Sequence, residues 1–194
     1  GQNSIFNETK KLEPGTYFII NPYKEKEIEI KKYWNLNFIP DHTKTEDDWI
    51  EMLREELKKS IKMRMISDVP LGAFLSGGVD SSSVVALMSE ISNQPIKTFS
   101  IGFKEQEFNE LQYANIVAKR YNTDHHEMIV EPESIGILSK LVNAYDEPFA
   151  DSSQIPTYLV SVMAKEHVTV SLSGDAGDEL FCGYNRYLLT NNLW

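Results

Sequence analysis

The 194-residue sequence has only one cysteine and no long hydrophobic run. A single cysteine, Cys182, excludes a disulfide within the chain and makes a reducing compartment the default. The apolar stretches are far shorter than the roughly 20 residues needed to cross a bilayer, and the first residues lack the basic-then-apolar pattern of a secretory signal. We therefore expect a cytoplasmic protein with no membrane partner.

Basic residues are also scarce. The chain has 19 Lys and Arg against 29 Asp and Glu, which gives a formal net charge of −10. This balance provides no basic surface for nucleic acid, so no nucleic-acid partner is expected. The sequence also lacks the G-K-[ST] of a Walker A loop and the G-x-G-x-x-G of a dinucleotide fingerprint. A bound phosphate would have to be held by backbone dipoles and a cation.

The first part of the chain resembles a hairpin more than a domain. Residues 12–34 contain two apolar strand-like runs separated by Asn21-Pro22, which breaks regular structure. A polar connector follows, so we place a boundary between residues 1–40 and an α/β domain at 41–194. Because the chain begins without methionine and ends in a helix-like stretch, we expect it to be a piece of a longer protein.

Short apolar runs alternate with amphipathic stretches after residue 44. Thr45 is the expected N-cap of a first helix, with acidic residues in its first turn. Strands are predicted over residues 71–75, 96–103, 126–130 and 168–172, and helices over residues 81–91, 109–121, 134–145, 155–165 and 179–189. This order predicts a doubly wound parallel sheet with flanking helices, an α/β fold. Ligands bind such sheets at the carboxyl ends of the strands, so loops 76–80, 102–108 and 173–178 should line one face.

Residues 76–83 read Ser-Gly-Gly-Val-Asp-Ser-Ser-Ser, between a predicted strand and a predicted helix. Two glycines permit a tight turn with inward N–H groups, and the helix N-terminus adds partial positive charge. The hydroxyls of Ser76, Ser81 and Ser82 can hydrogen-bond phosphate oxygens. Asp80 alone would repel phosphate, so we expect it to hold a Mg²⁺ that bridges the phosphates. A plain strand-to-helix turn is the alternative, and the full string favours phosphate binding.

A second string, residues 171–181, follows the last predicted strand. It supplies small residues and three carboxylates, Asp175, Asp178 and Glu179, near the start of a helix. One of them can complete a Mg²⁺ site with Asp80, and another can act in proton transfer. Capping of the last helix is the alternative explanation. It accounts for any one of these carboxylates better than for all three opposite a phosphate loop.

Both strings resemble motifs of known families. S-G-G-V-D-S-S resembles the pyrophosphate loop of the ATP-pyrophosphatase superfamily, which cleaves ATP between its α and β phosphates. S-G-D-A-G-D-E-L-F-C-G-Y resembles a motif of the asparagine synthetases. Together with V-P-L-G-A-F-L, F-S-I-G-F and Y-D-E-P-F-A-D-S-S, these strings are similar to the synthetase domain of the glutamine-hydrolysing asparagine synthetases, from about residue 66 to residue 187. L-E-P-G-T-Y and Y-W-N-L resemble, more weakly, the end of that family's glutaminase domain.

The resemblance implies an adenine nucleotide alpha hydrolase-like fold and a reaction that uses ATP and Mg²⁺. Aspartate would be adenylated to β-aspartyl-AMP with release of pyrophosphate, and ammonia would then displace AMP to give asparagine. Residues carried over by motif are the pyrophosphate ligands Ser76, Gly77, Gly78, Ser81 and Ser82, the adenosine contacts Leu75, Ile101, Ser173 and Gly174, and the Mg²⁺ ligands Asp80 and Asp178. Asp175 would manage the proton of the incoming ammonia, and Glu179 completes the catalytic set with Asp178.

The loop over residues 146–153 is the candidate for binding the acceptor aspartate. Its polar side chains are Asp146, Glu147, Asp151 and Ser152. Carboxylates there could bind the amino group of aspartate. A solvated connection between two helices explains the loop nearly as well.

Two positions depart from the family pattern. Ala176 and Cys182 stand where the family commonly has glycine. An alanine disfavours a left-handed backbone conformation at residue 176. Cys182 is expected to be a small buried residue and not a nucleophile.

The resemblance also implies partners. The ammonia would come from glutamine through a glutaminase domain of the same parent chain, whose nucleophile is an N-terminal cysteine, whereas this chain begins with Gly1. A homodimer is one arrangement that the sequence leaves open. Three other functions also remain open: another pyrophosphate-loop enzyme such as a NAD synthetase, a related amidotransferase or cyclase acting on another carboxylate, and a nucleotide-binding fragment without catalysis.

Overall fold

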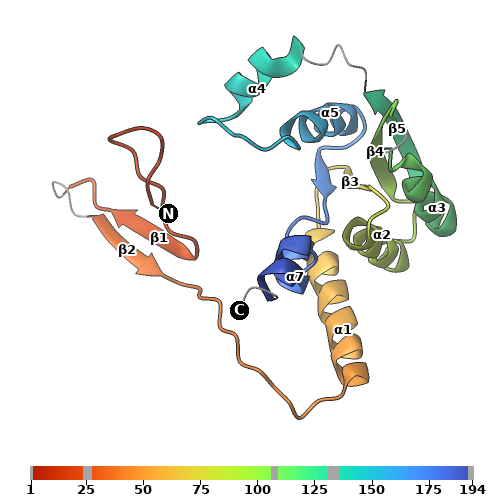
Figure 1. Ribbon diagram of the computed structural model, residues 1–194, viewed down its shortest axis with the longest axis horizontal. Coiled ribbons are helices and arrows are strands. Elements are labelled where there is room, and N and C mark those ends of the chain that lie inside the picture. The colour runs from red at the N-terminus through yellow and green to blue at the C-terminus, as the bar shows by residue number, and fades with distance from the viewer. Residues whose placement is uncertain (1, 24–27, 106–108, 131–135, 192–194) are drawn as a thin grey trace.

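A computed structural model describes residues 2–23, 28–105, 109–130 and 136–191. Figure 1 shows two parts, a small hairpin near the N-terminus and a four-stranded sheet covered by helices. Strands β1 (Thr16–Ile20) and β2 (Ile28–Lys32) pair antiparallel, with Thr16 opposite Lys32. An extended segment joins the hairpin to the first helix. The predicted hairpin is thus confirmed.

The larger sheet is wholly parallel. Its strands are β3 (Leu71–Phe74), β4 (Lys97–Phe103), β5 (Asp124–Val130) and β6 (Val170–Leu172). They lie in the order β5-β4-β3-β6, so the chain first moves outward from β3 and then returns to its other side. This reversal makes the gap between β3 and β6 the topological switch point, where open α/β sheets bind ligands beyond the carboxyl ends of the strands.

Helices cover both faces of this sheet. They are α1 (Glu46–Arg64), α2 (Val79–Ile91), α3 (Leu111–Tyr121), α4 (Leu138–Ala144), α5 (Gln154–Lys165), α6 (Gly177–Phe181) and α7 (Asn185–Asn191). In Figure 1, α2 and α3 lie on one face and α5 lies on the other. The predicted doubly wound α/β fold is therefore confirmed. Of the helix predicted over residues 134–145, the first two residues lie outside the described part, and α4 forms the last portion.

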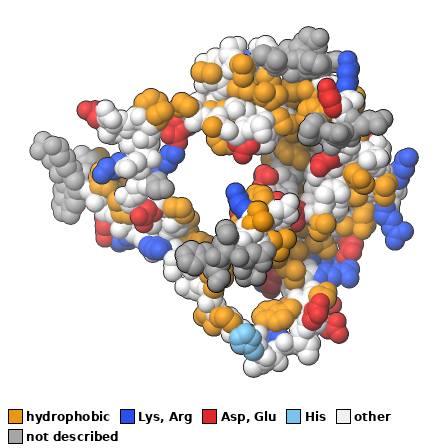
Figure 2. Space-filling model, viewed as in Figure 1, with side chains coloured by type: hydrophobic (Ala, Val, Ile, Leu, Met, Phe, Trp, Pro, Cys, Tyr) orange, Lys and Arg blue, Asp and Glu red, His pale blue; other side chains and the backbone are white. Residues whose placement is uncertain are grey.

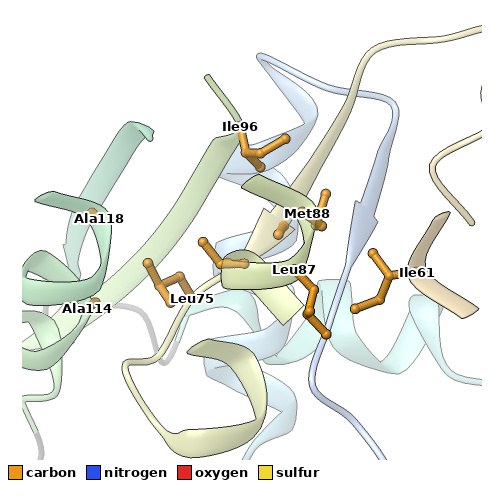
Figure 3. Close-up of a cluster of buried hydrophobic side chains, with 9 residues drawn as sticks. Ile61, Leu75, Leu87, Met88, Ile96, Ala114 and Ala118 are labelled. Carbon is orange, nitrogen blue, oxygen red and sulfur yellow. The ribbon is translucent and has the colours of Figure 1, made fainter. Parts of the chain in front are cut away.

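The core divides between the two faces because successive strand residues point in opposite directions. Ala73 and Leu75 pack with residues of α1, α2 and α3, including Met88, in one buried cluster (Figure 3). Phe99 packs on the other face with Val160 and further residues of α5. Alternate residues of the same strands thus pack against the helices on opposite faces of the sheet.

The first helix begins where the sequence predicts. Thr45 is its N-cap, and its hydroxyl accepts a hydrogen bond from the backbone N–H of Asp48 at 3.2 Å. In return, the Asp48 carboxylate accepts a hydrogen bond from the backbone N–H of Thr45 at 2.9 Å. This capping box satisfies two donors at the start of the helix and fixes its first turn.

The single helix predicted over residues 179–189 is wrong, because α6 and α7 are separate helices. Cys182 adopts a left-handed conformation with φ of 57° and ends α6. The N–H of Gly183 then donates to the carbonyl oxygen of Asp178 at 3.0 Å, an arrangement typical of helix C-termini. The periodic pattern of apolar residues continues across the turn at Cys182, so this pattern does not indicate that the helix ends there.

Figure 2 shows hydrophobic side chains on the surface of both parts. In the hairpin, Phe18, Ile20 and Ile30 are half-exposed or more. A two-stranded hairpin needs further strands or helices to be independently stable. The hairpin therefore has apolar side chains that no described element covers. No helix among the described residues is long and apolar enough to cross a membrane.

Candidate active site

The two motifs meet at the switch point of the sheet. The loop after β3 and the loop after β6 face each other across a cavity of about 260 Å³. Its lining residues are Phe74, Ser76, Gly78, Asp80, Ser81, Ser173, Gly174 and Asp175. All but Phe74 were predicted as site residues, so the fold brings residues of both motifs together in one place.

The N-terminus of α2 carries backbone donors without partners. Gly78 is its N-cap and offers no side-chain cap, and the first intrahelical bond runs from the Ser82 N–H to the Gly78 carbonyl at 3.0 Å. The N–H groups of residues 79–81 consequently have no acceptor in the described part of the chain. Three such donors and the positive end of a 13-residue helix dipole suit a phosphate.

Serine hydroxyls brace the loop that precedes α2. The hydroxyl oxygens of Ser76 and Ser81 lie 2.9 Å apart, and the Gly78 N–H donates to Ser76 Oγ at 3.2 Å. Ser81 Oγ also donates to the Gly78 carbonyl at 3.3 Å. Ser82 does not line the cavity, and its buried hydroxyl has no hydrogen-bond partner among the described residues. The structure thus brings Ser76 and Ser81 to the cavity, and the predicted role of Ser82 stays a prediction.

Gly77 shapes the loop without lining the cavity. Its φ of +86° is left-handed, and a Cβ there would lie 2.5 Å from the Ala114 nitrogen and from Tyr113 Cβ. The loop therefore packs against the start of α3 too closely for any side chain. Glycine is required by both the turn and this contact.

Of the four carboxylates predicted in the two motifs, two line the cavity, and Asp178 and Glu179 do not. Asp80 and Asp175 line it, and the Ser173 hydroxyl donates to Asp175 Oδ2 at 2.9 Å. Asp178 does not line the cavity, and its carboxylate lies against Gly183. The metal site shared by Asp80 and Asp178 therefore stays a prediction.

The donor set fits a nucleotide-borne Mg²⁺ better than a protein cage. No three His, Cys, Asp or Glu side chains within the described ranges form a cluster that could hold a metal. Mg²⁺ in phosphate sites commonly takes one or two carboxylates and completes its shell with phosphate oxygens and water. Asp80 beside free N–H groups meets that requirement.

Glu179 is held by the segment that follows α6. Tyr184 Oη donates to Glu179 Oε1 at 2.8 Å, and the Arg186 guanidinium lies 4.0 Å from the centre of the Tyr184 ring. The hydrogen bond from Tyr184 is the main reason why the pKa of Glu179 lies below its ordinary value. Sequence reasoning missed Tyr184, although its family string includes this tyrosine.

Tyr184→Phe is expected to return the pKa of Glu179 toward its ordinary value. Because the folded-state pKa of Glu179 is depressed, its stabilising effect is present above the ordinary carboxyl pKa and lost as the pH falls. The free energy of unfolding of the Tyr184→Phe protein should therefore no longer include the part of its pH dependence that Glu179 contributes. A ¹³C-carboxyl NMR titration measures the change, and an unchanged midpoint for Glu179 would contradict the assigned hydrogen bond.

Ala176 and Cys182 both adopt left-handed conformations, with φ of 72° and 57°. The expectation drawn from alanine at residue 176 is therefore wrong: the loop imposes the glycine-like conformation on a residue with a side chain. The expectation that Cys182 is buried is also wrong, because it is exposed. A left-handed non-glycine residue costs about 1–2 kcal/mol.

Glycine is expected to stabilise both positions. Ala176→Gly and Cys182→Gly should each raise the free energy of unfolding by about 1 kcal/mol, since strain relief exceeds the added chain entropy. Ala86→Gly, within α2, is the matched control and should lower it by about 1 kcal/mol. Urea denaturation measures all three, and equal losses at all three positions would refute the argument.

A second cavity of about 430 Å³ adjoins the first at Phe74 and Ser76. Leu75 and Ile101 line it together with Phe103, and their predicted contact with adenosine stays a prediction. Ser173 and Gly174 line only the first of these two cavities. Glu110 and Thr157 also line the second cavity, and sequence reasoning missed both. Their sequence neighbourhoods carry no motif that could have revealed them.

The predicted acceptor residues lie elsewhere. Asp146 and Glu147 line a separate cavity of about 460 Å³. Glu147 pairs with Lys11 and accepts a hydrogen bond from the Ile5 N–H at 3.3 Å. Asp151 accepts a hydrogen bond from the Ser153 N–H at 2.8 Å.

Ser152 lies in the exposed turn before α5. The structure thus brings none of the four predicted acceptor residues to the phosphate cavity. Their role in binding aspartate stays a prediction.

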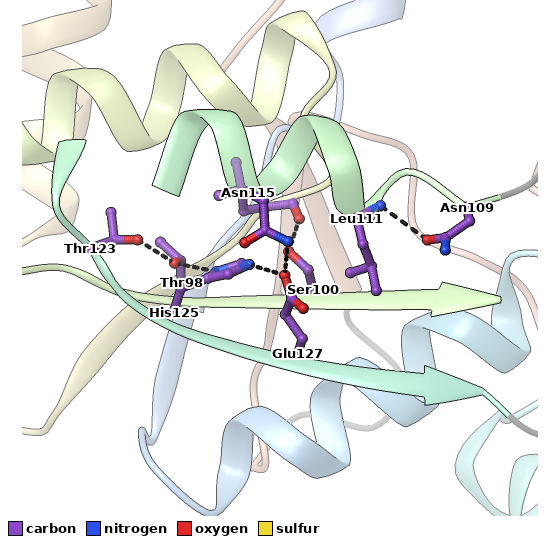
Figure 4. Close-up of polar contacts among 9 residues, drawn as sticks. Thr98, Ser100, Asn109, Leu111, Asn115, Thr123, His125 and Glu127 are labelled. Carbon is purple, nitrogen blue, oxygen red and sulfur yellow. Dashed lines mark hydrogen bonds and ion pairs between the residues drawn. The ribbon is translucent and has the colours of Figure 1, made fainter. Parts of the chain in front are cut away.

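A polar network lies between β4, β5 and α3, at a distance in sequence from both motifs (Figure 4). His125 Nδ1 lies 2.8 Å from Thr98 Oγ1, and its Nε2 lies 3.2 Å from Glu127 Oε1. Burial is the main cause of the lowered pKa of His125. The next residue, His126, points to the other face and stacks on Phe99 with ring centres 5.4 Å apart. Adjacent strand residues thus point to opposite faces of the sheet and serve separate packing roles.

The parallel sheet, with two loops that face each other across a cavity at its switch point, defines an α/β domain of the open-sheet class. The family model for asparagine synthase matches residues 52–194. The chain belongs to the asparagine synthase family, which confirms the resemblance read from its motifs.

Two curated relatives match most of the chain. It is 42% identical over 179 residues to asparagine synthetase (glutamine-hydrolyzing) 1 of Bacillus subtilis, covering 92% of this chain and 28% of that protein. It is 44% identical over 191 residues to an asparagine synthetase homologue of Methanocaldococcus jannaschii, covering 95% of this chain and 36% of the other. The chain therefore spans about a third of the length of these relatives.

Two further likenesses are weaker. Amidase chyE of Penicillium rubens is 26% identical over 206 residues, covering 95% of this chain and 30% of that protein. The NH3-dependent NAD synthetase of Campylobacter jejuni is 18% identical over 70% of this chain and 60% of its own, with a TM-score of 0.47. Because this structural similarity is weak, the family assignment rests on the sequence matches alone.

Proposed function

We propose that this chain is the synthetase domain of an enzyme that makes asparagine from aspartate, ammonia and ATP, with release of AMP and pyrophosphate. The observation that carries the proposal is the cavity of about 260 Å³ at the switch point, which is lined by Asp175 and by Asp80 in the uncapped first turn of α2. Membership of the asparagine synthase family supports it. Adenylation needs charge stabilised on departing pyrophosphate, and backbone donors at a helix N-terminus suit that task.

The residues divide the work by position. The N–H groups of residues 79–81 and the hydroxyls of Ser76 and Ser81 would bind the pyrophosphate portion of ATP. Mg²⁺, held at Asp80, would neutralise charge on the phosphates. Leu75 and Ile101 would contact adenosine in the adjoining cavity. Asp175 lines the cavity and would accept the proton of the incoming ammonia.

Glu179 and Asp178 are proposed to assist from outside the cavity lining. The Tyr184 hydroxyl donates to the Glu179 carboxylate and lowers the pKa of Glu179 below its ordinary value. A carboxylate held in this way can order the short helix α6 behind Asp175. Asp178 would join Asp80 in holding Mg²⁺.

Partners follow from the same proposal. The hairpin before residue 41 would be the end of a glutaminase domain of the parent protein, and residues 41–194 would belong to the synthetase domain. The exposed apolar side chains of the hairpin support this division. The glutaminase domain would release ammonia from glutamine in the cytoplasm, and the ammonia would pass to the cavity of the synthetase domain. A homodimer is part of the proposal only as an arrangement to be measured.

Product analysis tests the proposal. The complete gene product is incubated with α-labelled ATP, Mg²⁺, ammonium and aspartate, and the products are separated by mass. The proposal predicts labelled AMP and asparagine in equal amounts. Labelled ADP would contradict it, because cleavage would then fall between the β and γ phosphates.

A second candidate function keeps the chemistry and changes the acceptor. The relative named amidase chyE covers nearly all of this chain, and the predicted acceptor residues lie away from the phosphate cavity. Another carboxylate could therefore take the place of aspartate. AMP formation that requires a different carboxylic acid in the same assay would select this second function. AMP formation in the absence of any carboxylic acid would favour neither the first nor the second function.

A further inference from the structure

The two motif loops touch at a point where neither has room for another atom. A Cβ at Gly177 would lie 2.6 Å from Asp80 Oδ1 and 2.7 Å from Asp80 Oδ2, with Cγ closer still. A Cβ at Gly174 would lie 2.7 Å from the Ser81 nitrogen and 3.0 Å from Asp80 Cβ. Carbon atoms in a packed interior approach such neighbours no closer than ordinary van der Waals contact. Glycines of the second loop thus pack directly on Asp80 in the first.

The contact at Gly177 is specific to one side chain. The three nearest atoms to a Cβ at this position all belong to the Asp80 carboxylate. One residue earlier, Ala176 carries a methyl group even though its φ is 72°. Gly177 itself does not have a positive φ. Backbone conformation therefore does not explain the glycine at residue 177, whereas the Asp80 carboxylate does.

This contact restrains the Asp80 side chain without a hydrogen bond or ion pair to its carboxylate oxygens. Within the described residues, the Asp80 carboxylate takes part in no hydrogen bond and no ion pair, whereas Asp175 is tied to Ser173. A carboxylate that is held by packing alone keeps its lone pairs for a cation. Because Mg²⁺ requires near-octahedral geometry at 2.0–2.1 Å, a small displacement of the carboxylate weakens its binding.

We propose that Gly177 is a positioning residue for Asp80: by carrying no side chain, it lets the carboxylate lie at the edge of the phosphate cavity with both oxygens free to bind Mg²⁺. Gly174 holds the backbone of Asp80 and Ser81 in the same way. The cation-binding part of this inference rests on the proposed function. The steric part rests on the contact alone.

A double-mutant cycle in the complete gene product tests the steric part. Gly177→Ala should lower the melting temperature in the native background. In the Asp80→Ala background the same change should lower it no further, because the clashing atoms are gone and alanine is the better helix former. An equal loss in both backgrounds would overturn the proposal. Gly136→Ala, where a Cβ would meet nothing within 4 Å, is the matched control and should behave alike in both.

A magnesium titration of ATP binding tests the positioning role. Gly177→Ala should raise the Mg²⁺ concentration needed for half-maximal ATP binding by about tenfold or more, as is usual when a ligand's support is removed. ATP affinity without Mg²⁺ should stay unchanged. A shift caused by Asp80→Ala but not by Gly177→Ala would overturn the positioning role. No shift in either variant would overturn the metal role of Asp80 itself, while the melting cycle still decides the contact.

Discussion

Asp80→Ala is expected to reduce the adenylation rate by about 10³-fold, because it removes a carboxylate that lines the phosphate cavity from the uncapped first turn of α2. The protein should remain folded. A carboxylate in the first turn of a helix contributes only about 0.3–1 kcal/mol through the helix dipole. Pre-steady-state formation of AMP in the complete gene product measures the rate, and circular dichroism checks the fold.

Asp47→Ala is the matched control for this prediction. Asp47 also lies in the first turn of a helix, α1, and it lines neither the 260 Å³ cavity nor the 430 Å³ cavity. Its loss should change stability by a similar small amount and leave the adenylation rate unchanged. If both variants lost activity equally, the assignment of Asp80 to the phosphates would be refuted.

Phe99→Ala is expected to lower the free energy of unfolding by about 3–5 kcal/mol, because it opens a cavity in the core cluster on the α5 face. Phe99 is fully buried, packs with Val160 and stacks on His126. Its ring also lines the proposed adenosine cavity, so ATP binding should weaken as well. Urea denaturation and ATP titration measure the two effects.

Phe38→Ala provides the comparison for Phe99. The Phe38 side chain is 85% exposed and lies in the connector before α1. Truncation there should change stability by no more than about 0.5 kcal/mol. Similar losses at both positions would show that the two-face core is wrongly described.

The sheet and most of the phosphate cavity could be predicted from sequence because their signals are local and repeated. Short apolar runs alternating with amphipathic stretches fix the order of strands and helices. The loops after β3 and β6 must then meet, since both follow parallel strands that are neighbours in the sheet. The positions of Asp80 and Asp175 at the ends of these strands therefore predict that both lie at one site.

Other features depend on contacts that sequence patterns do not encode. The break at Cys182 interrupts a continuous apolar pattern, and the left-handed conformation of Ala176 is imposed by its loop. Glu147 is paired with Lys11, more than 130 residues earlier in the chain. The sequence shows the charges of the loop over residues 146–153 but does not show this pairing. The packing of Gly177 on Asp80 likewise joins two motifs that are far apart in sequence.

The central claim is that this cavity supports adenylation of a carboxylate, and ATP–pyrophosphate isotope exchange tests it most directly. The complete gene product is given Mg²⁺, ATP and labelled pyrophosphate, with aspartate or other carboxylic acids added in turn. The account predicts exchange that requires aspartate and that disappears in Asp80→Ala. Bound ATP without exchange for any carboxylic acid would contradict it and would leave a nucleotide-binding domain without catalysis.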